Sequence, residues 1–271
     1  MLKDITIGQF FPGDSLLHRL DPRVKIVLTI AFIAAVFLPK TWAGLALAVV
    51  FLAVAIALSK LPFSLIRKSI TPILPIILFT AVLSILYVQG GTVLVSWWKI
   101  TVSMKGLQNA VFLAVRIICL IAGSSLLTYT TGPTTLTDAL ERLMKPLKVL
   151  RIPVHDLAMM MTIALRFIPT LIEETDKIMA AQKARGADLE SGNLIERIRA
   201  LMPIMIPLFA SSFRRAYELA TAMECRCYNG GDGRTRMTSL KTAMRDYLAL
   251  AVMAVVIAGM ILLNIVLPNV I

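Results

Sequence analysis

Residues 247–267 read YLALAVMAVVIAGMILLNIVL, a stretch without a single charged side chain. A helix needs about 20 consecutive apolar residues to cross the hydrocarbon core of a bilayer, and this stretch is long enough. The rest of the chain has the same character, with 58% hydrophobic residues and a mean hydropathy of +0.80 over 271 residues. Such a composition is far too apolar for a soluble domain. The sequence therefore predicts an all-α integral membrane protein.

Four other apolar segments precede this one, which makes about five transmembrane helices in total. A turn at Pro39, a basic loop over 59–69 and a loop that starts at Gln89 separate them. The last of these loops carries Trp97 and Trp98, a pair typical of an anchor at the membrane interface. The four spans are expected at 25–38, 42–58, 70–88 and 106–129.

The sequence between the fourth and the last span is of another kind. It holds most of the acidic residues of the chain, yet its apolar side chains recur at three- and four-residue steps. This periodicity predicts three helices on the cytoplasmic side, two of them long and amphipathic. They are expected over 136–150, 154–184 and 194–225. The chain then divides into an N-terminal segment (1–24), transmembrane helices 1–4 (25–130), a coupling-helix module (131–245) and the last transmembrane helix (246–271).

The distribution of Lys and Arg, which give the chain its net charge of +12, favours one orientation in the membrane. Lys and Arg hold loops on the cytoplasmic side, and most basic residues fall on one side if the N-terminus is cytoplasmic. We therefore expect the N-terminus and the coupling module inside, the C-terminus outside, and the lipid membrane as the surrounding partner. No nucleic-acid-binding motif is visible, so nucleic acid is not an expected partner.

Both long amphipathic helices end in the same way. The two ends are Ala184-Arg185-Gly186 and Cys225-Arg226-Cys227, and helix-breaking sequence follows each. A single end of this type is most simply a C-terminal cap whose Arg complements the helix dipole. An Arg with small neighbours is also a projecting cation that can enter a carboxylate-lined groove of a partner. Its repetition favours docking to two similar partners, or to one two-fold partner.

Prolines lie upstream of both ends, at Pro169 in the first helix and at Pro203 and Pro207 in the second. Proline removes a backbone hydrogen bond and permits a bend. A bent, amphipathic pair of helices suits a lever better than a channel wall.

Two further arginines lie in apolar surroundings and are interpreted as structural charges. Arg116 is in the middle of the fourth span, where a charge is costly unless it is paired, and we expect it to pair with the coupling helices or to snorkel. Arg166 is expected to be buried and to link two helices by pairing with Glu173 or Asp138.

Three cysteines do not suggest a disulfide framework or a metal site. Cys225 and Cys227 are close together, but His18 and His155 are far away in sequence, which makes a poor ligand set for zinc. We therefore expect no metal and no cofactor bound by this chain. The methionine-rich stretch at 159–161, with Met202 and Met205, is either ordinary core or an adaptable surface for exchangeable partners.

Four segments together resemble one family, the transmembrane T component of energy-coupling factor (ECF) transporters, also named CbiQ/EcfT. They are DSLLHRLDPRVK (14–25), LRFIP (165–169), AQKARG (181–186) and AMECRCYNGGDGRT (222–235). The resemblance extends over nearly the whole chain. The second signature of the family is usually Ala-Arg-Gly again, whereas this chain has Cys-Arg-Cys, so the conformational freedom of glycine at Cys227 is lost.

The resemblance implies a non-catalytic coupling subunit of a vitamin or micronutrient importer in a prokaryotic plasma membrane. It implies that Arg185 and Arg226 insert into grooves of two cytosolic ATPase subunits, identical or different, which bind ATP and Mg²⁺. It also implies that the apolar faces of the coupling helices cradle an interchangeable, substrate-binding membrane subunit, the S component. The residues expected to contact it are Met159, Met160, Leu165, Ile168, Met202, Met205 and Phe209.

Other functions stay open at this point. The Gly-Gly, Asp and Arg-Thr after the second end resemble the shared-module group, while a dedicated cobalt/nickel or biotin importer is the alternative. A stand-alone secondary permease would normally have polar groups at midplane in symmetry-related broken helices. An enzyme would need a nucleophile and base or a metal motif, and no HExxH, GxSxG or Walker lysine loop is present.

Overall fold

The computed structural model describes residues 10–88, 93–97, 100–150, 153–187, 194–230 and 242–267. It divides into two compact units, one formed by Gly8–Leu136 with Ser239–Ile271 and the other by Thr137–Thr238 with Met1–Ile7. We call them the bundle unit and the coupling unit. The structure is helical almost throughout, which confirms the predicted all-α class.

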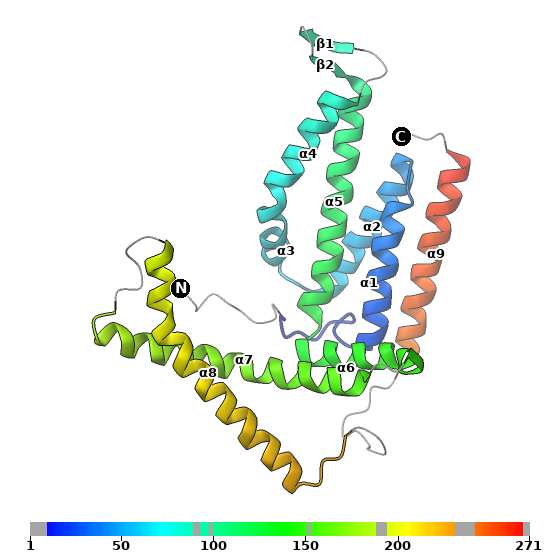
Figure 1. The fold of residues 1–271 in the computed structure, drawn as a ribbon. Helices are drawn as coiled ribbons and strands as arrows, with labels where there is room; N and C mark the ends of the chain where they lie inside the picture. The colour runs from blue at the N-terminus through cyan, green and yellow to red at the C-terminus, as the bar shows by residue number, and fades with distance from the viewer. Residues whose placement is uncertain are drawn as a thin grey trace. The chain divides into compact units, whose positions relative to one another are not determined.

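The bundle unit contains the apolar helices, which lie side by side (Figure 1). They are α1 (Pro22–Phe37), α2 (Trp42–Ser59), α3 (Phe63–Ile70), the 3-10 helix η1 (Thr71–Ile73), α4 (Leu74–Tyr87), α5 (Met104–Thr130) and α9 (Met244–Val266). Two features of the bundle unit differ from the prediction. Residues 59–69 contain helix α3 rather than only a loop, and part of the loop after Gln89 is a short antiparallel hairpin of β1 (Val93–Trp97) and β2 (Ile100–Ser103).

The core of the bundle unit forms where α1 and α2 each pack against α5 and α9. Phe32 of α1 lies against Gly123 of α5, and a Cβ at position 123 would come within 2.5 Å of its ring. The absence of a side chain at Gly123 therefore sets how closely α1 and α5 approach. Other fully buried core residues are Val36, Ala48, Ala122 and Met260.

The turn between α1 and α2 is held by two polar side chains from neighbouring helices. Arg116 of α5 donates to the carbonyl of Pro39 at 2.7 Å and stacks over the ring of Phe112. Asn264 of α9 donates to the carbonyl of Leu38 at 2.7 Å and accepts from the amide of Lys40 at 3.0 Å. These bonds satisfy backbone groups at the end of α1 that have no partner within the helix.

The other end of α1 is held by buried charged groups. Asp21 caps α1 by accepting from the amide of Arg23 at 2.9 Å, and Pro22 holds the first helical position, an Asp-Pro pair typical of a helix start. Its own amide donates to Asp246 of α9 at 2.8 Å. Lys25 donates to the carbonyl of Thr130, the last residue of α5, at 2.9 Å. The start of α1, the start of α9 and the end of α5 thus share one network.

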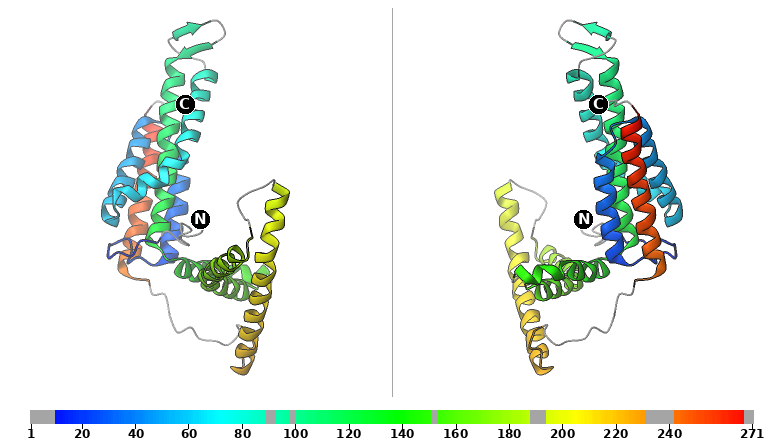
Figure 2. Two further views of the ribbon diagram at one scale, coloured as in Figure 1. Left: turned by 90° about the vertical axis from the view of Figure 1, so that its left-hand side faces the viewer. Right: turned by 90° about the vertical axis from the view of Figure 1, so that its right-hand side faces the viewer.

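The coupling unit is built on two long helices that cross each other (Figure 2). These are α7 (Val154–Ala184) and α8 (Leu194–Cys225), whose bounds agree with the predicted ranges. The predicted helix at 136–150 is in two pieces, α6 (Pro133–Met144) and the 3-10 helix η2 (Lys145–Leu150), with Pro146 in the second piece.

Five helical segments in the described parts of the chain are long and apolar enough to cross a membrane: α2, Phe63–Tyr87, α5, α7 and α9. The number agrees with the prediction, but the membership differs. Helix α7 is predicted as a coupling helix, whereas α1, the predicted first span, has 16 residues. A helix of that length is about 24 Å long, shorter than the hydrocarbon core of about 30 Å, so the assignment of α1 as a span stays a prediction.

The network around Asp246 predicts a specific loss of stability. Asp246 is buried, and its two carboxylate oxygens accept from the amides of Asp21 and Ala243. In Asp246→Asn the side-chain N–H₂ faces one of these two donors, so one hydrogen bond is lost. We expect the free energy of unfolding to fall by about 1–3 kcal/mol, measured as a lower melting temperature in detergent. Asp156→Asn is the matched control, because Asp156 holds the same position in the first turn of α7 but is exposed. Equal melting temperatures for the two variants would contradict a structural role for the network.

Candidate partner-docking site

The end of α7 is a Schellman cap that places Arg185 at the helix tip. The amide of Ala187 donates to the carbonyl of Gln182 at 3.0 Å, and that of Gly186 to Lys183 at 3.0 Å. This pattern requires a left-handed residue after the helix, and Gly186 has a φ of +87°. Arg185 is exposed, and its guanidinium has no hydrogen bond or ion pair among the described residues.

The end of α8 has the same cap with a different residue at the critical position. The amide of Tyr228 donates to the carbonyl of Met223 at 3.0 Å, and that of Cys227 to Glu224 at 2.8 Å. Cys227 takes the left-handed role with a φ of +54°. The exposed Arg226 occupies the place that Arg185 has in α7, again without a side-chain partner in the parts of the chain described. The two ends are therefore alike in backbone geometry as well as in sequence.

Two polar ties join α7 to α8. Glu174 of α7 accepts a short hydrogen bond from Ser211 and a bond from Arg215 at 3.0 Å, both on α8. Gln182 of α7 donates to the carbonyl of Pro203 at 3.4 Å. That carbonyl lacks its usual helical donor because residue 207, four positions later, is a proline. One proline of α8 thus frees a carbonyl that α7 uses, three residues before Arg185.

The coupling unit exposes a broad apolar surface, mainly on α8. Of the residues expected to contact a membrane partner, Met160, Met202, Met205 and Phe209 are exposed, and Met159, Leu165 and Ile168 are half-buried. Ile206, Phe213 and Tyr217 extend the same stripe along α8, with Phe213 73% and Tyr217 75% exposed. An uncovered patch of this kind is typical of a protein-binding or lipid-facing surface.

Arg116 and Arg166, the two arginines predicted to be structural charges, do not have the partners that were predicted for them. Arg166 is exposed on α7 and has no side-chain partner among the described residues, so the structure does not show the predicted buried tie to Glu173 or Asp138. The tie between the long helices comes instead from Glu174 and Arg215. Arg116 is paired, as its position in a span requires, but with the α1–α2 turn rather than with the coupling helices.

No cluster of three or more His, Cys, Asp or Glu side chains suited to a metal occurs in the described residues. Cys225 and Cys227 are exposed free thiols, and Cys119 is a buried one. Residues 231–235 of the last resemblance segment lie outside the described residues. The sequence did not predict the roles of Glu174, Ser211 and Asn264. Each of these side chains binds a residue that is distant in sequence, so no periodicity or spacing indicates its partner.

Comparison with known proteins shows the family of this chain. The family model of CbiQ, described as a cobalt transport protein, matches residues 13–238. The chain belongs to the CbiQ/EcfT family. Its relatives include proteins named energy-coupling factor transporter transmembrane protein EcfT. The one from Clostridium kluyveri is 55% identical over 92% of this chain and 93% of its own length. The one from Ruminiclostridium cellulolyticum is 49% identical over 97% of this chain and 98% of its own length. That from Brevibacillus brevis is 51% identical over 95% and 97%. The chain is thus a multi-pass transmembrane component of a transporter.

The two caps of this CbiQ/EcfT chain predict opposite effects of exchanging their left-handed residues. Left-handed backbone costs a non-glycine residue roughly 1–2 kcal/mol. We therefore expect Cys227→Gly to protect the last amides of α8 from hydrogen exchange, and Gly186→Ala to expose those of α7. Cys225→Gly is the control, because it replaces a neighbouring cysteine inside the helix and should weaken α8 instead. If Cys227→Gly also weakened the end of α8, the left-handed conformation of Cys227 would be refuted.

Proposed function

We propose that this chain is the membrane coupling subunit of an ECF-type importer. It transmits the ATP-driven motion of two cytosolic ATPase subunits to a membrane-embedded S component that binds the vitamin or micronutrient. The observation that carries the proposal is the pair of equivalent helix ends, each presenting an exposed arginine that has no side-chain partner among the described residues. A guanidinium forms two parallel hydrogen bonds with a carboxylate, which suits a stiff joint in a groove. ATP and Mg²⁺ bind to the partners, and this chain contributes no catalytic group.

The ties between α7 and α8 support a lever mechanism. Glu174 and Gln182 bind α8 at two separate places, which hold the helices together where they cross. Arg185 and Arg226 lie beyond these attachments, at the ends of the two helices. Movement of one ATPase relative to the other then changes the angle between the helices. The apolar stripe on α8 changes its orientation with that angle, and so does the platform under the S component.

We assign the chain to a prokaryotic plasma membrane, with the N-terminus and the coupling module inside and the C-terminus outside. The segments are then 1–24 as the cytoplasmic N-terminus, 25–130 and 246–271 as membrane helices and 131–245 as the coupling module. We favour the shared-module type, in which several S components use one coupling subunit. The exposed methionines of the coupling unit support this choice, because Met side chains repack easily against different partners. A dedicated cobalt, nickel or biotin module is the alternative.

Charge reversal at both helix ends tests the ATPase contacts. We expect Arg185→Glu with Arg226→Glu to abolish recovery of both ATPases when the tagged chain is purified in mild detergent, because a carboxylate groove repels a carboxylate. Arg166→Glu with Arg199→Glu is the matched control, since both arginines are exposed on the same helices but away from the ends that carry Arg185 and Arg226. Equal losses in the two double variants, or no loss in the first, would refute docking through the helix ends.

Polar substitution on α8 tests the S-component surface separately. We expect Met202→Ser with Phe209→Ser to lose the small membrane partner by at least tenfold while the ATPases are retained. Removing two exposed apolar anchors weakens an interface but leaves the helix ends intact. Val49→Ser with Val50→Ser, which changes exposed apolar residues of α2, is the control. Recovery of several different small membrane proteins with the unmodified chain would support the shared-module type, and recovery of one would support a dedicated module.

A further inference from the structure

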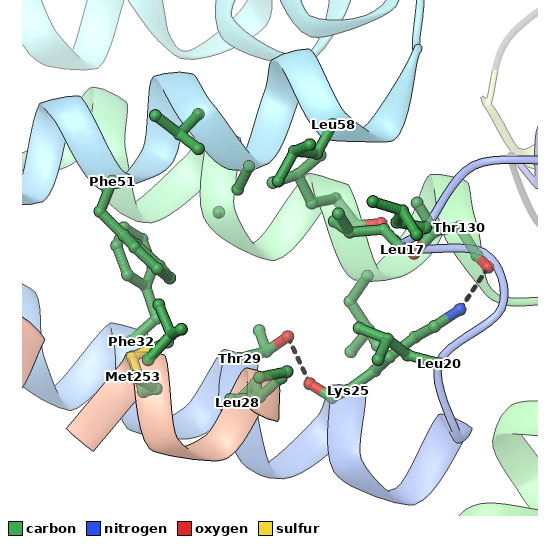
Figure 3. A pocket seen from close by; sticks show the side chains of 18 of the residues that line it. Leu17, Leu20, Lys25, Leu28, Thr29, Phe32, Phe51, Leu58, Thr130 and Met253 are labelled. Carbon is green, nitrogen blue, oxygen red and sulfur yellow. Dashed lines mark hydrogen bonds between the residues drawn. The ribbon is translucent and has the colours of Figure 1, made fainter. Parts of the chain in front are cut away.

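The bundle unit contains a cavity that the coupling function does not use (Figure 3). Its volume is about 460 Å³, and side chains from α1, α2, α5, α9 and the segment before α1 line it. Its size is within the range of about 300–1,000 Å³ that is usual for pockets that hold small molecules. A space of this size is costly to leave empty in a packed interior, because its lining loses dispersion contacts.

The lining is almost entirely aliphatic and aromatic. Leu28, Phe32, Phe51 and Met253 are among the side chains that line it (Figure 3). Val54, Leu58, Leu248 and Val252, which also line it, are 44–65% exposed on the outside of the bundle unit. The cavity therefore opens between residues that would face lipid. In a membrane, the abundant apolar group at such an opening is an acyl chain.

Basic groups lie at one end of the cavity, near the starts of α1 and α9. Lys25 is buried there, but its ammonium donates to three oxygens, those of Thr130, His18 and Thr131, and so has no proton left for a ligand. Arg245 is different, because it lines the cavity, is exposed and has no side-chain partner in the described parts of the chain. It also lies in the first turn of α9, where the helix dipole favours an anion.

We propose that this cavity binds one acyl chain of an anionic phospholipid whose phosphate is bound by Arg245. Long apolar walls fit the chain. A free guanidinium at the mouth attracts a headgroup with a net negative charge more strongly than a zwitterionic one, in which an ammonium offsets the charge of the phosphate. In the proposed orientation this end is cytoplasmic, and the cytoplasmic leaflet is the one rich in anionic lipid. The lipid would fill the space between α1, α2 and α9.

Photo-crosslinking of the full chain in phosphatidylcholine nanodiscs tests the site. The probe is phosphatidylglycerol with a diazirine in one acyl chain, and labelled peptides are mapped by mass spectrometry. We expect labels on the residues that line the cavity, with unlabelled phosphatidylglycerol competing about fivefold better than phosphatidylcholine. Labels confined to the outer faces of the helices, with none in the cavity, would overturn the proposal.

Two matched pairs of variants separate the chain-binding and headgroup-binding parts. Ala249→Phe places a ring in the cavity and should abolish the cavity labels, whereas Ala251→Phe, on the exposed side of α9, should keep them. Arg245→Gln should remove the preference for phosphatidylglycerol, whereas Arg67→Gln, an exposed arginine of α3, should leave it. Because the arginine exchange does not touch the core, its result does not depend on how the filled variant folds. Equal behaviour of Arg245→Gln and Arg67→Gln would overturn the assignment of the phosphate to Arg245.

Discussion

The backbone groups at both ends of α1 bind side chains of neighbouring helices, and the bundle unit is arranged around these hydrogen bonds. A buried amide or carbonyl without a partner costs about 1–3 kcal/mol. At one end, Arg116 and Asn264 bind the carbonyls of the α1–α2 turn. At the other, the amide of Asp21 binds Asp246. Because these side chains come from α5 and α9, satisfying the ends of α1 also fixes which helices surround it.

The coupling unit follows a different principle: among its described residues few apolar side chains are buried, and those exposed on α8 are not covered by other described parts of the unit. Its long helices are joined by polar ties at Glu174 and Gln182 rather than by a continuous core. Two polar ties at separate places hold the helices together with fewer interdigitated side chains than a continuous core would have. In the function proposed above, such a unit would transmit a change of angle between its helix ends to a partner on α8.

Local signals predict some of this structure and fail where the determinant is distant in sequence. The cap at Asp21 and the bounds of α7 and α8 follow from caps, breakers and periodicity, which act within a few residues. Helix α3 was not predicted because Arg67 and Lys68 make 59–69 resemble a loop, although they lie in the last turn, where the helix dipole favours them. The partners of Arg116, Arg166 and Glu174 depend on which helices meet, and hydrophobic periodicity gives the face of a helix but not its neighbour.

The two helix ends show which part of the Ala-Arg-Gly signature geometry demands. Glycine is the least costly residue in the left-handed position, yet Cys227 occupies it at the end of α8 with the same pair of backbone hydrogen bonds that Gly186 allows in α7. The cap therefore determines the backbone conformation, and glycine only reduces its cost. Because the backbone is the same, the Cα–Cβ bond of the arginine leaves each tip in the same direction relative to its helix axis. Under the proposed function, two equal grooves on a partner would accept Arg185 and Arg226 alike, although the residues after them differ.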